Sequence, residues 1–108
     1  MKVQTPFEWN QRSRLLEQRE RSRRLRGDLR TAATTRSEYE PHDVVDDEAA
    51  IQADVLDAKL EAIEIALERI ESGNYGSCTS CNAEIGEQRL EALPTATTCR
   101  SCAASDVA

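Results

Sequence analysis

Apolar residues recur at alternating steps of four and three between positions 49 and 70, and this is the clearest pattern in the chain. The series is Ala49, Ala53, Leu56, Leu60, Ile63, Leu67 and Ile70. Such spacing places an apolar residue on one face of a helix every 3.5 residues on average, as in a coiled coil. Val55, Ile65 and Ala66 flank the series and are expected to widen the apolar stripe. The pattern predicts a helix over about residues 46–72, with Gly73 as its C-terminal stop.

The N-terminal segment predicts a partner helix over about residues 6–30. Thr5 can cap its start, Pro6 suits the first helical position, and Glu8 completes a capping box. One heptad seam follows, and it has a polar gap in its middle: Leu15, Gln18, Ser22, Leu25 and Leu29. No apolar periodicity continues beyond it, so a tip loop is predicted over about residues 31–45.

Charge is spread unevenly and favours pairing of these two helices. Residues 1–40 hold ten basic and six acidic residues, a balance of +4, whereas residues 41–77 hold two and ten, a balance of −8. A basic helix beside an acidic one favours an antiparallel hairpin over self-pairing of either, so a monomer is expected. Residues 78–108 add −2, which brings the net charge to −6.

Four cysteines form two C-x-x-C pairs, Cys78 with Cys81 and Cys99 with Cys102, with seventeen residues between the pairs. A two-residue gap lets both thiolates of a pair reach one ion, and two pairs close a tetrahedral site, so the spacing predicts one structural Zn²⁺ with four cysteine ligands. Two disulfides or four ordinary buried thiols are the alternative. His42 is too remote in sequence to join the site and is expected to be a solvated loop residue.

The fold class that follows is mainly α. An antiparallel two-helix coiled-coil hairpin is expected over residues 1–74, and a small four-cysteine zinc finger with a short C-terminal helix over residues 75–108. With 108 residues and 4% aromatics, the chain is short of core-forming side chains, and a metal is one common way to hold so small a lobe together. Four protein ligands leave zinc no open position for substrate, so no enzyme activity is expected.

Compartment and nucleic-acid binding follow from the same composition. No apolar run is long enough to cross a bilayer, and the N-terminus lacks the apolar stretch of a secretory signal, so a cytoplasmic protein with reduced thiols and no membrane contact is expected. Four thiolates and one Zn²⁺ make the acidic finger more negative still. A phosphate backbone would repel it, so direct sequence-specific DNA binding is not expected.

The finger resembles the four-cysteine zinc finger of the DksA/TraR family. The matching features are Tyr75-Gly76 before the first cysteine, Glu84-Ile85-Gly86, Arg89-Leu90-Glu91-Ala92, Pro94-Thr95-Ala96 and the seventeen-residue gap. The resemblance implies a bacterial transcription regulator that binds RNA polymerase through its secondary channel and modulates initiation, often together with the alarmone ppGpp at the polymerase interface. It also implies two aspartates at the hairpin tip that act near the polymerase active site, and here Asp43 and Asp46 supply that D-x-x-D pattern.

The sequence departs from the family pattern in three respects. The first is that the run from Asp43 to Cys78 is shorter than in the long-armed members. Glu48 stands at the position of the tip alanine, and Asn82 stands after the second cysteine where glycine is common. Asparagine tolerates the left-handed conformation that glycine adopts there, so the metal loop is expected to form. Three alternatives stay open: Asp43 and Asp46 as plain helix caps, a nucleic-acid-binding zinc ribbon, and a thiol-based redox sensor in which oxidation releases zinc.

Overall fold

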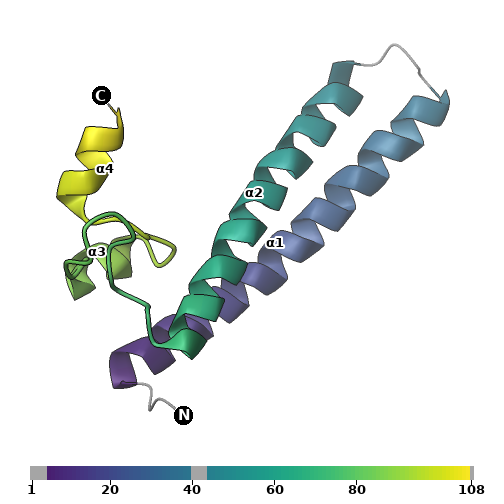
Figure 1. Cartoon of the computed structure of the whole chain (residues 1–108). Helices are drawn as coiled ribbons and strands as arrows, with labels where there is room; N and C mark the ends of the chain where they lie inside the picture. The colour runs from purple at the N-terminus through teal and green to yellow at the C-terminus, as the bar shows by residue number, and fades with distance from the viewer. Residues whose placement is uncertain (1–4, 40–43, 108) are drawn as a thin grey trace. The chain divides into compact units, whose positions relative to one another are not determined.

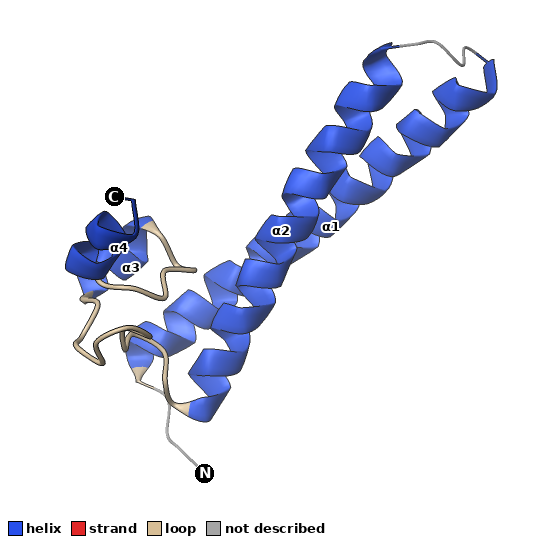
Figure 2. Cartoon of the chain, turned by 45° about the horizontal axis from the view of Figure 1, so that its top comes forward, coloured by secondary structure: helices blue, strands red, loops and turns tan. Residues whose placement is uncertain are grey.

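The chain folds into four helices, α1 (Pro6–Tyr39), α2 (Val44–Ser72), α3 (Glu87–Ala92) and α4 (Arg100–Val107), shown in Figures 1 and 2. This computed structural model describes residues 5–39 and 44–107, and the side chains of residues 5–32 and 48–104. Within those ranges no strand occurs, and one isolated antiparallel bridge joins Ser77 to Glu84. The predicted fold class is confirmed: the protein is mainly α, with a helical hairpin followed by a cysteine-bearing lobe.

The molecule divides into two compact units, and each contains a part of both long helices. One unit is Met1–Leu16 together with Ile63–Ala108, and the other is Glu17–Ala62. The first therefore holds the start of α1, the end of α2 and the whole cysteine-bearing lobe, and the second holds the rest of α1 and α2. The expected domain boundary between residues 74 and 75 stays a prediction.

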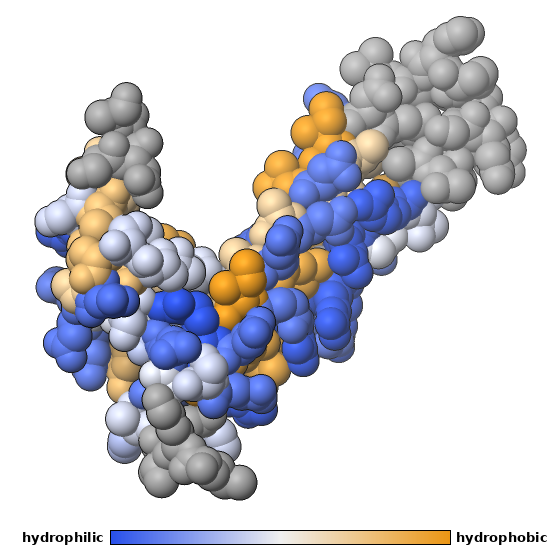
Figure 3. Space-filling view, in the orientation of Figure 1, coloured by the Kyte–Doolittle hydropathy of each residue, from blue (hydrophilic) through white to orange (hydrophobic). Residues whose placement is uncertain are grey.

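The heptad series on α2 forms the buried face of that helix, as predicted. In the first unit, Ile63 and Ile70 pack with Leu15 of α1, and Ala66 completes this buried cluster. In the second unit, Ala49, Ala53 and Leu60 are buried. The predicted widening of the stripe is wrong for two residues, because 64% of Val55 and 43% of Ile65 remain exposed. Apolar surface is correspondingly visible along α2 in Figure 3.

The first helix is longer than predicted. It continues nine residues past Arg30, to Tyr39, so most of the expected tip loop over residues 31–45 is helical. A loss of apolar periodicity marks the end of burial and does not end a helix. Residues 31–39 contain neither glycine nor proline and include the good helix formers alanine, arginine and glutamate. Pro41 is the first strong stop signal after Arg30, and the described helix ends two residues before it.

Both predicted helix signals at the ends of the hairpin are confirmed. The Glu8 backbone N–H donates to Thr5 Oγ1 at 3.1 Å, which satisfies one of the unpaired amides of the first turn of α1. At the end of α2, the Gly73 N–H donates to Ile70 O at 3.3 Å and the Asn74 N–H to Arg69 O at 2.8 Å. Gly73 has φ 82°, so this pair of bonds is a Schellman motif that ends the helix and turns the chain toward the cysteines.

Ion pairs join α1 to α2 within the unit of residues 17–62. Arg26 Nη1 donates to Asp57 Oδ1 at 3.1 Å, and Arg30 Nη2 donates to Asp57 Oδ2 and lies 3.5 Å from Asp54 Oδ1. Burial by itself would raise the pKa of Asp57, but hydrogen bonds from Arg26 and Arg30 outweigh it and hold that pKa below its ordinary value. The basic and acidic arms are thus in contact, as the charge pattern predicts.

Replacing Asp57 by Asn is expected to lower the midpoint of thermal unfolding at pH 7 by a small amount, since the pair is partly exposed. A carboxyl whose pKa is lowered in the folded state contributes stability above its unfolded pKa of about 3.9, and this contribution is lost as the pH falls through the folded pKa. The difference between wild type and D57N should therefore shrink below about pH 4. Circular dichroism melts across pH measure it, with D28N as an exposed control; a pH-independent difference would contradict the assignment.

Candidate metal centre

The four cysteines converge in the structure although they come from two separate segments. Their Sγ atoms all lie within 4.8 Å of one another, and Cys81 Sγ is 3.8 Å from Cys99 Sγ. A tetrahedral zinc ion with Zn–S bonds of about 2.3 Å requires sulfurs about 3.8 Å apart, so the donor set fits the ion. All four are free thiols, so the disulfide alternative finds no support. The cluster is a four-cysteine site for one structural zinc, with Cys78, Cys81, Cys99 and Cys102 as its ligands.

The first pair lies on a tight backbone turn. The Cys78 N–H donates to Ala83 O at 2.8 Å, the Asn82 N–H donates to Cys78 O at 3.0 Å, and the Ser80 N–H donates to Cys78 Sγ at 3.4 Å. Asn82 has φ 63°, the left-handed conformation expected at this position in place of glycine. Because the turn closes on its own backbone, the spacing of Cys78 and Cys81 is set locally.

The second pair lies at the start of α4. Cys99 directly precedes the helix and its carbonyl accepts from the Ala103 N–H at 2.9 Å, which places Cys102 in the first turn. The unpaired amides of a helix start favour negative charge and so favour thiolates at this place. A bond from the Thr79 N–H to Thr97 O at 2.9 Å joins the two cysteine loops.

Electrostatics within the cluster point to a site made for a cation. A hydrogen bond from the backbone of Cys99 lowers the pKa of Cys78 to about 6, against the opposing effect of burial. Hydrogen bonding with Cys99, and then with Cys78, raises the pKa of Cys102 to about 12. Hydrogen bonding within the cluster thus favours the thiolate of Cys78 and the protonated thiol of Cys102. A bound Zn²⁺ offsets the repulsion between neighbouring thiolates, so all four ligands can ionise.

The metal loops rest on a small core to which α1 contributes. Cys78, Ile85, Leu90 and Ala96 are buried together, and Phe7 of α1 and Tyr75 pack against them. Several hydrogen bonds tie the lobe together. The Tyr75 hydroxyl donates to Pro94 O at 2.8 Å, and Arg89 Nε donates to Thr98 O at 3.1 Å.

Gln11 is a buried residue that sequence reasoning missed. It is 2% exposed, and its Nε2 donates to Leu90 O at 2.8 Å and to the Tyr75 hydroxyl at 3.1 Å, while its Oε1 accepts from Arg14 at 2.9 Å. The signal that could have found it is position, because Gln11 lies four residues before Leu15 and continues the heptad seam. The amide therefore acts as a polar bridge between α1 and the lobe.

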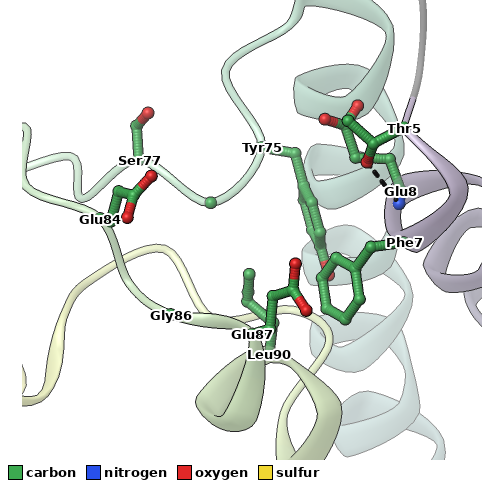
Figure 4. A pocket seen from close by; sticks show the side chains of 10 residues that line it. Thr5, Phe7, Glu8, Tyr75, Ser77, Glu84, Gly86, Glu87 and Leu90 are labelled. Atoms are coloured by element: carbon green, nitrogen blue, oxygen red, sulfur yellow. Dashed lines mark hydrogen bonds between the residues drawn. The ribbon is translucent and has the colours of Figure 1, made fainter.

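An acidic hollow lies beside this core, and Figure 4 shows its lining. It has a volume of about 250 Å³, with the rings of Phe7 and Tyr75 on one side and the carboxylates of Glu8, Glu84 and Glu87 around it. None of the described lysines and arginines lines it. Since a nucleic-acid backbone is attracted by basic surface, this face offers a phosphate chain no favourable contact.

Comparison with known proteins identifies the lobe. Residues 73–106 match the family described as the prokaryotic dksA/traR C4-type zinc finger, and this stretch contains all four ligands. The whole structure is similar to that of transcription factor DksA2 from Pseudomonas aeruginosa, with a TM-score of 0.74 and 27% identity over 93% of this chain and 82% of that one. The finger is thus similar to the dksA/traR type, and the chain as a whole is similar in structure to a DksA2 protein.

Curated relatives match a shorter part of this chain. The RNA polymerase-binding transcription factor DksA of Buchnera aphidicola is 49% identical over 43 residues, and that of Escherichia coli K12 is 46% identical over 43 residues. Each alignment covers 40% of this chain and 28% of the relative. The chain is thus matched over less than a third of the length of these relatives.

The predicted tip residues are not tested by the structure. Asp43 lies outside the described residues, and only the backbone of Asp46 is described, within the first turn of α2. Their role stays a prediction. Among the described residues, no helix is both long enough and apolar enough to span a membrane.

Proposed function

We propose that this protein binds RNA polymerase in the cytoplasm and modulates transcription initiation, with its helical hairpin entering the secondary channel. The observation that carries the proposal is the DksA2-like structure over 93% of the chain together with the dksA/traR finger at residues 73–106. In this proposal the zinc site has a structural role. Its four ligands fold the lobe and leave no position on the metal for a substrate, so the protein is a regulator and not an enzyme.

The two alternative functions gain less support. A nucleic-acid-binding ribbon needs basic surface near the metal, whereas the hollow beside this lobe carries three carboxylates. A redox sensor needs a reactive thiolate, and zinc lowers the reactivity of a thiolate that it binds. Because Cys81 is exposed, zinc release under mild peroxide tests the redox-sensor alternative.

The experiment that tests the proposal measures binding of the purified, zinc-loaded protein to purified RNA polymerase by light scattering and pull-down. We expect a monomer when free and a complex with polymerase when mixed. A parallel in-vitro transcription assay, run with and without ppGpp, measures the effect on initiation. Absence of a complex at micromolar concentrations of both partners would overturn the proposal.

Changing Asp43 and Asp46 together to Asn is expected to preserve polymerase binding and to abolish the effect on initiation. Neutral amides keep the capping geometry available to the start of α2, but they lack the charge that the proposed role requires. The readout is transcript yield at polymerase saturation. The control is D28N with D54N, which removes two carboxylates from the arms of the hairpin. Equal transcription effects of the tip variant and wild type would refute the tip assignment.

A further inference from the structure

A second apolar series runs along α2, on the side of the helix that faces away from α1. Its members follow one another at steps of four, three and four, and we call them the outer seam: Ile51, Val55, Ala58 and Ala62. All four lie in the unit of residues 17–62. The buried Ala53 and Leu60 each lie two positions after a member of this series, and two positions turn a helix by about 200°. The outer seam therefore repeats the heptad spacing of the buried series on the opposite face of the helix.

The outer seam is exposed along its length. Ile51 is 62% exposed and Val55 is 64% exposed, whereas Leu60 of the buried series is 6% exposed. Ala58 is also exposed, and Ala62 is half-buried. A single exposed apolar residue is ordinary on a protein surface, but apolar residues at successive heptad positions form a continuous stripe, and Figure 3 shows apolar surface along α2. A stripe with this period fits another helix, whose side chains pack between its residues.

Acidic side chains beside the outer seam determine the charge of the helix that fits it. Asp54 and Glu61 are seven residues apart, and each directly precedes an apolar member, so they occupy equivalent positions on one flank. Glu61 is exposed, and the side chain of Asp54 is 76% exposed although it lies 3.5 Å from Arg30. The equivalent positions on the other flank are Gln52 and Lys59. Charges at flanking positions select the partner of a coiled coil, so a helix with lysine or arginine opposite Asp54 and Glu61 is complementary to this face.

We propose that the outer seam binds a basic amphipathic helix of another protein. A second copy of this chain fits poorly, because an antiparallel pair of α2 helices would bring Asp54 and Glu61 of both copies onto the same flank, where they repel. The basic α1 of a second copy already packs Leu15 against its own α2. A membrane surface is disfavoured as well, since anionic headgroups repel the same carboxylates. The proposal goes beyond polymerase binding and does not rest on it.

The test is isothermal titration of the full, zinc-loaded protein with a synthetic helical peptide that has leucine at its heptad positions and lysine beside them. We expect saturable binding of one peptide per chain, and no measurable binding of the same peptide with glutamate in place of lysine. The variant I51S with V55S should bind about a hundredfold more weakly, because each side chain contributes a factor of about ten or more when it is buried. Its unfolding midpoint should change little, since both residues are exposed and serine has a similar helix propensity. Undiminished binding in this variant would show that the peptide displaces α1 from the buried series, and would overturn the proposal.

Charge variants separate a specific flank from general attraction between a basic peptide and an acidic protein. D54N with E61Q is expected to weaken binding of the lysine peptide about fivefold, since exposed ion pairs contribute modestly. The control E20Q with D28N removes two exposed carboxylates from α1 and should change affinity by less than about twofold. Equal losses in both double variants would overturn the site. Sedimentation of the protein alone tests the other occupant, because a dimer that I51S with V55S dissociates would assign the outer seam to a second copy and refute the proposal.

Discussion

Replacing Cys78 by Ser is expected to release the zinc ion and to unfold the lobe around it. Among the described residues, the lobe buries few side chains, namely Cys78, Ile85, Leu90, Pro94 and Ala96, and this is too little apolar surface to offset the entropy of ordering the segment. Metal binding supplies the difference, since structural zinc in small fingers contributes about 10–16 kcal/mol. We expect zinc content near zero, rapid proteolysis between residues 73 and 106, and retained helical circular dichroism from the hairpin.

The matched control for this variant is S80A, which lies in the same turn between two ligands. The Ser80 backbone N–H donates to Cys78 Sγ and is unaffected by the change, so S80A should keep stoichiometric zinc and resist proteolysis. A C78S protein that held one zinc per chain and resisted protease like wild type would show that the four-cysteine site is wrong.

The long pairing of α1 and α2 was predictable because burial imposes a period on the sequence. Leu60 and Ile63 lie at seam positions and are buried. The end of α1 at Tyr39 is not marked by any comparable apolar pattern in the sequence. Beyond the buried seam, helix formation depends on helix propensity and stop signals. These signals locate the end of a helix less accurately than an apolar period locates its buried face. At Val55 the sequence pattern predicted burial that the structure does not show, since an apolar residue beside a seam need not be buried.

The metal ligands were predictable for a different reason, which is that C-x-x-C spacing is local geometry. The supports of the site were not, because they join distant parts of the chain. Gln11 and Leu90 are 79 positions apart, and no periodicity links them. The surroundings of Ser22 lie between these cases: the polar gap is visible in the sequence, but the position of Lys59, which lines the same cavity as Ser22, depends on the register of two helices. Register is set by packing of the whole hairpin, so it needed the structure.

Replacing Gln11 by Ala is expected to destabilise the lobe by about 3 kcal/mol. The substitution deletes bonds to Leu90 O and the Tyr75 hydroxyl, and each buried group left without its partner costs about 1–3 kcal/mol. The missing side-chain atoms also leave a cavity beside a residue that is 2% exposed. Urea unfolding followed by Tyr75-sensitive absorbance measures the loss, and zinc remains bound because no ligand has changed.

The isosteric variant Q11E tests whether the donor or the volume matters. A carboxylate of the same size has no N–H to donate to Leu90 O, and it brings charge into a buried position, so Q11E should cost at least as much as Q11A. N10A alters an exposed neighbour on α1 and should stay within about 0.5 kcal/mol of wild type. A Q11E protein as stable as N10A would mean that Gln11 fills space and does not bridge α1 to the zinc-binding lobe.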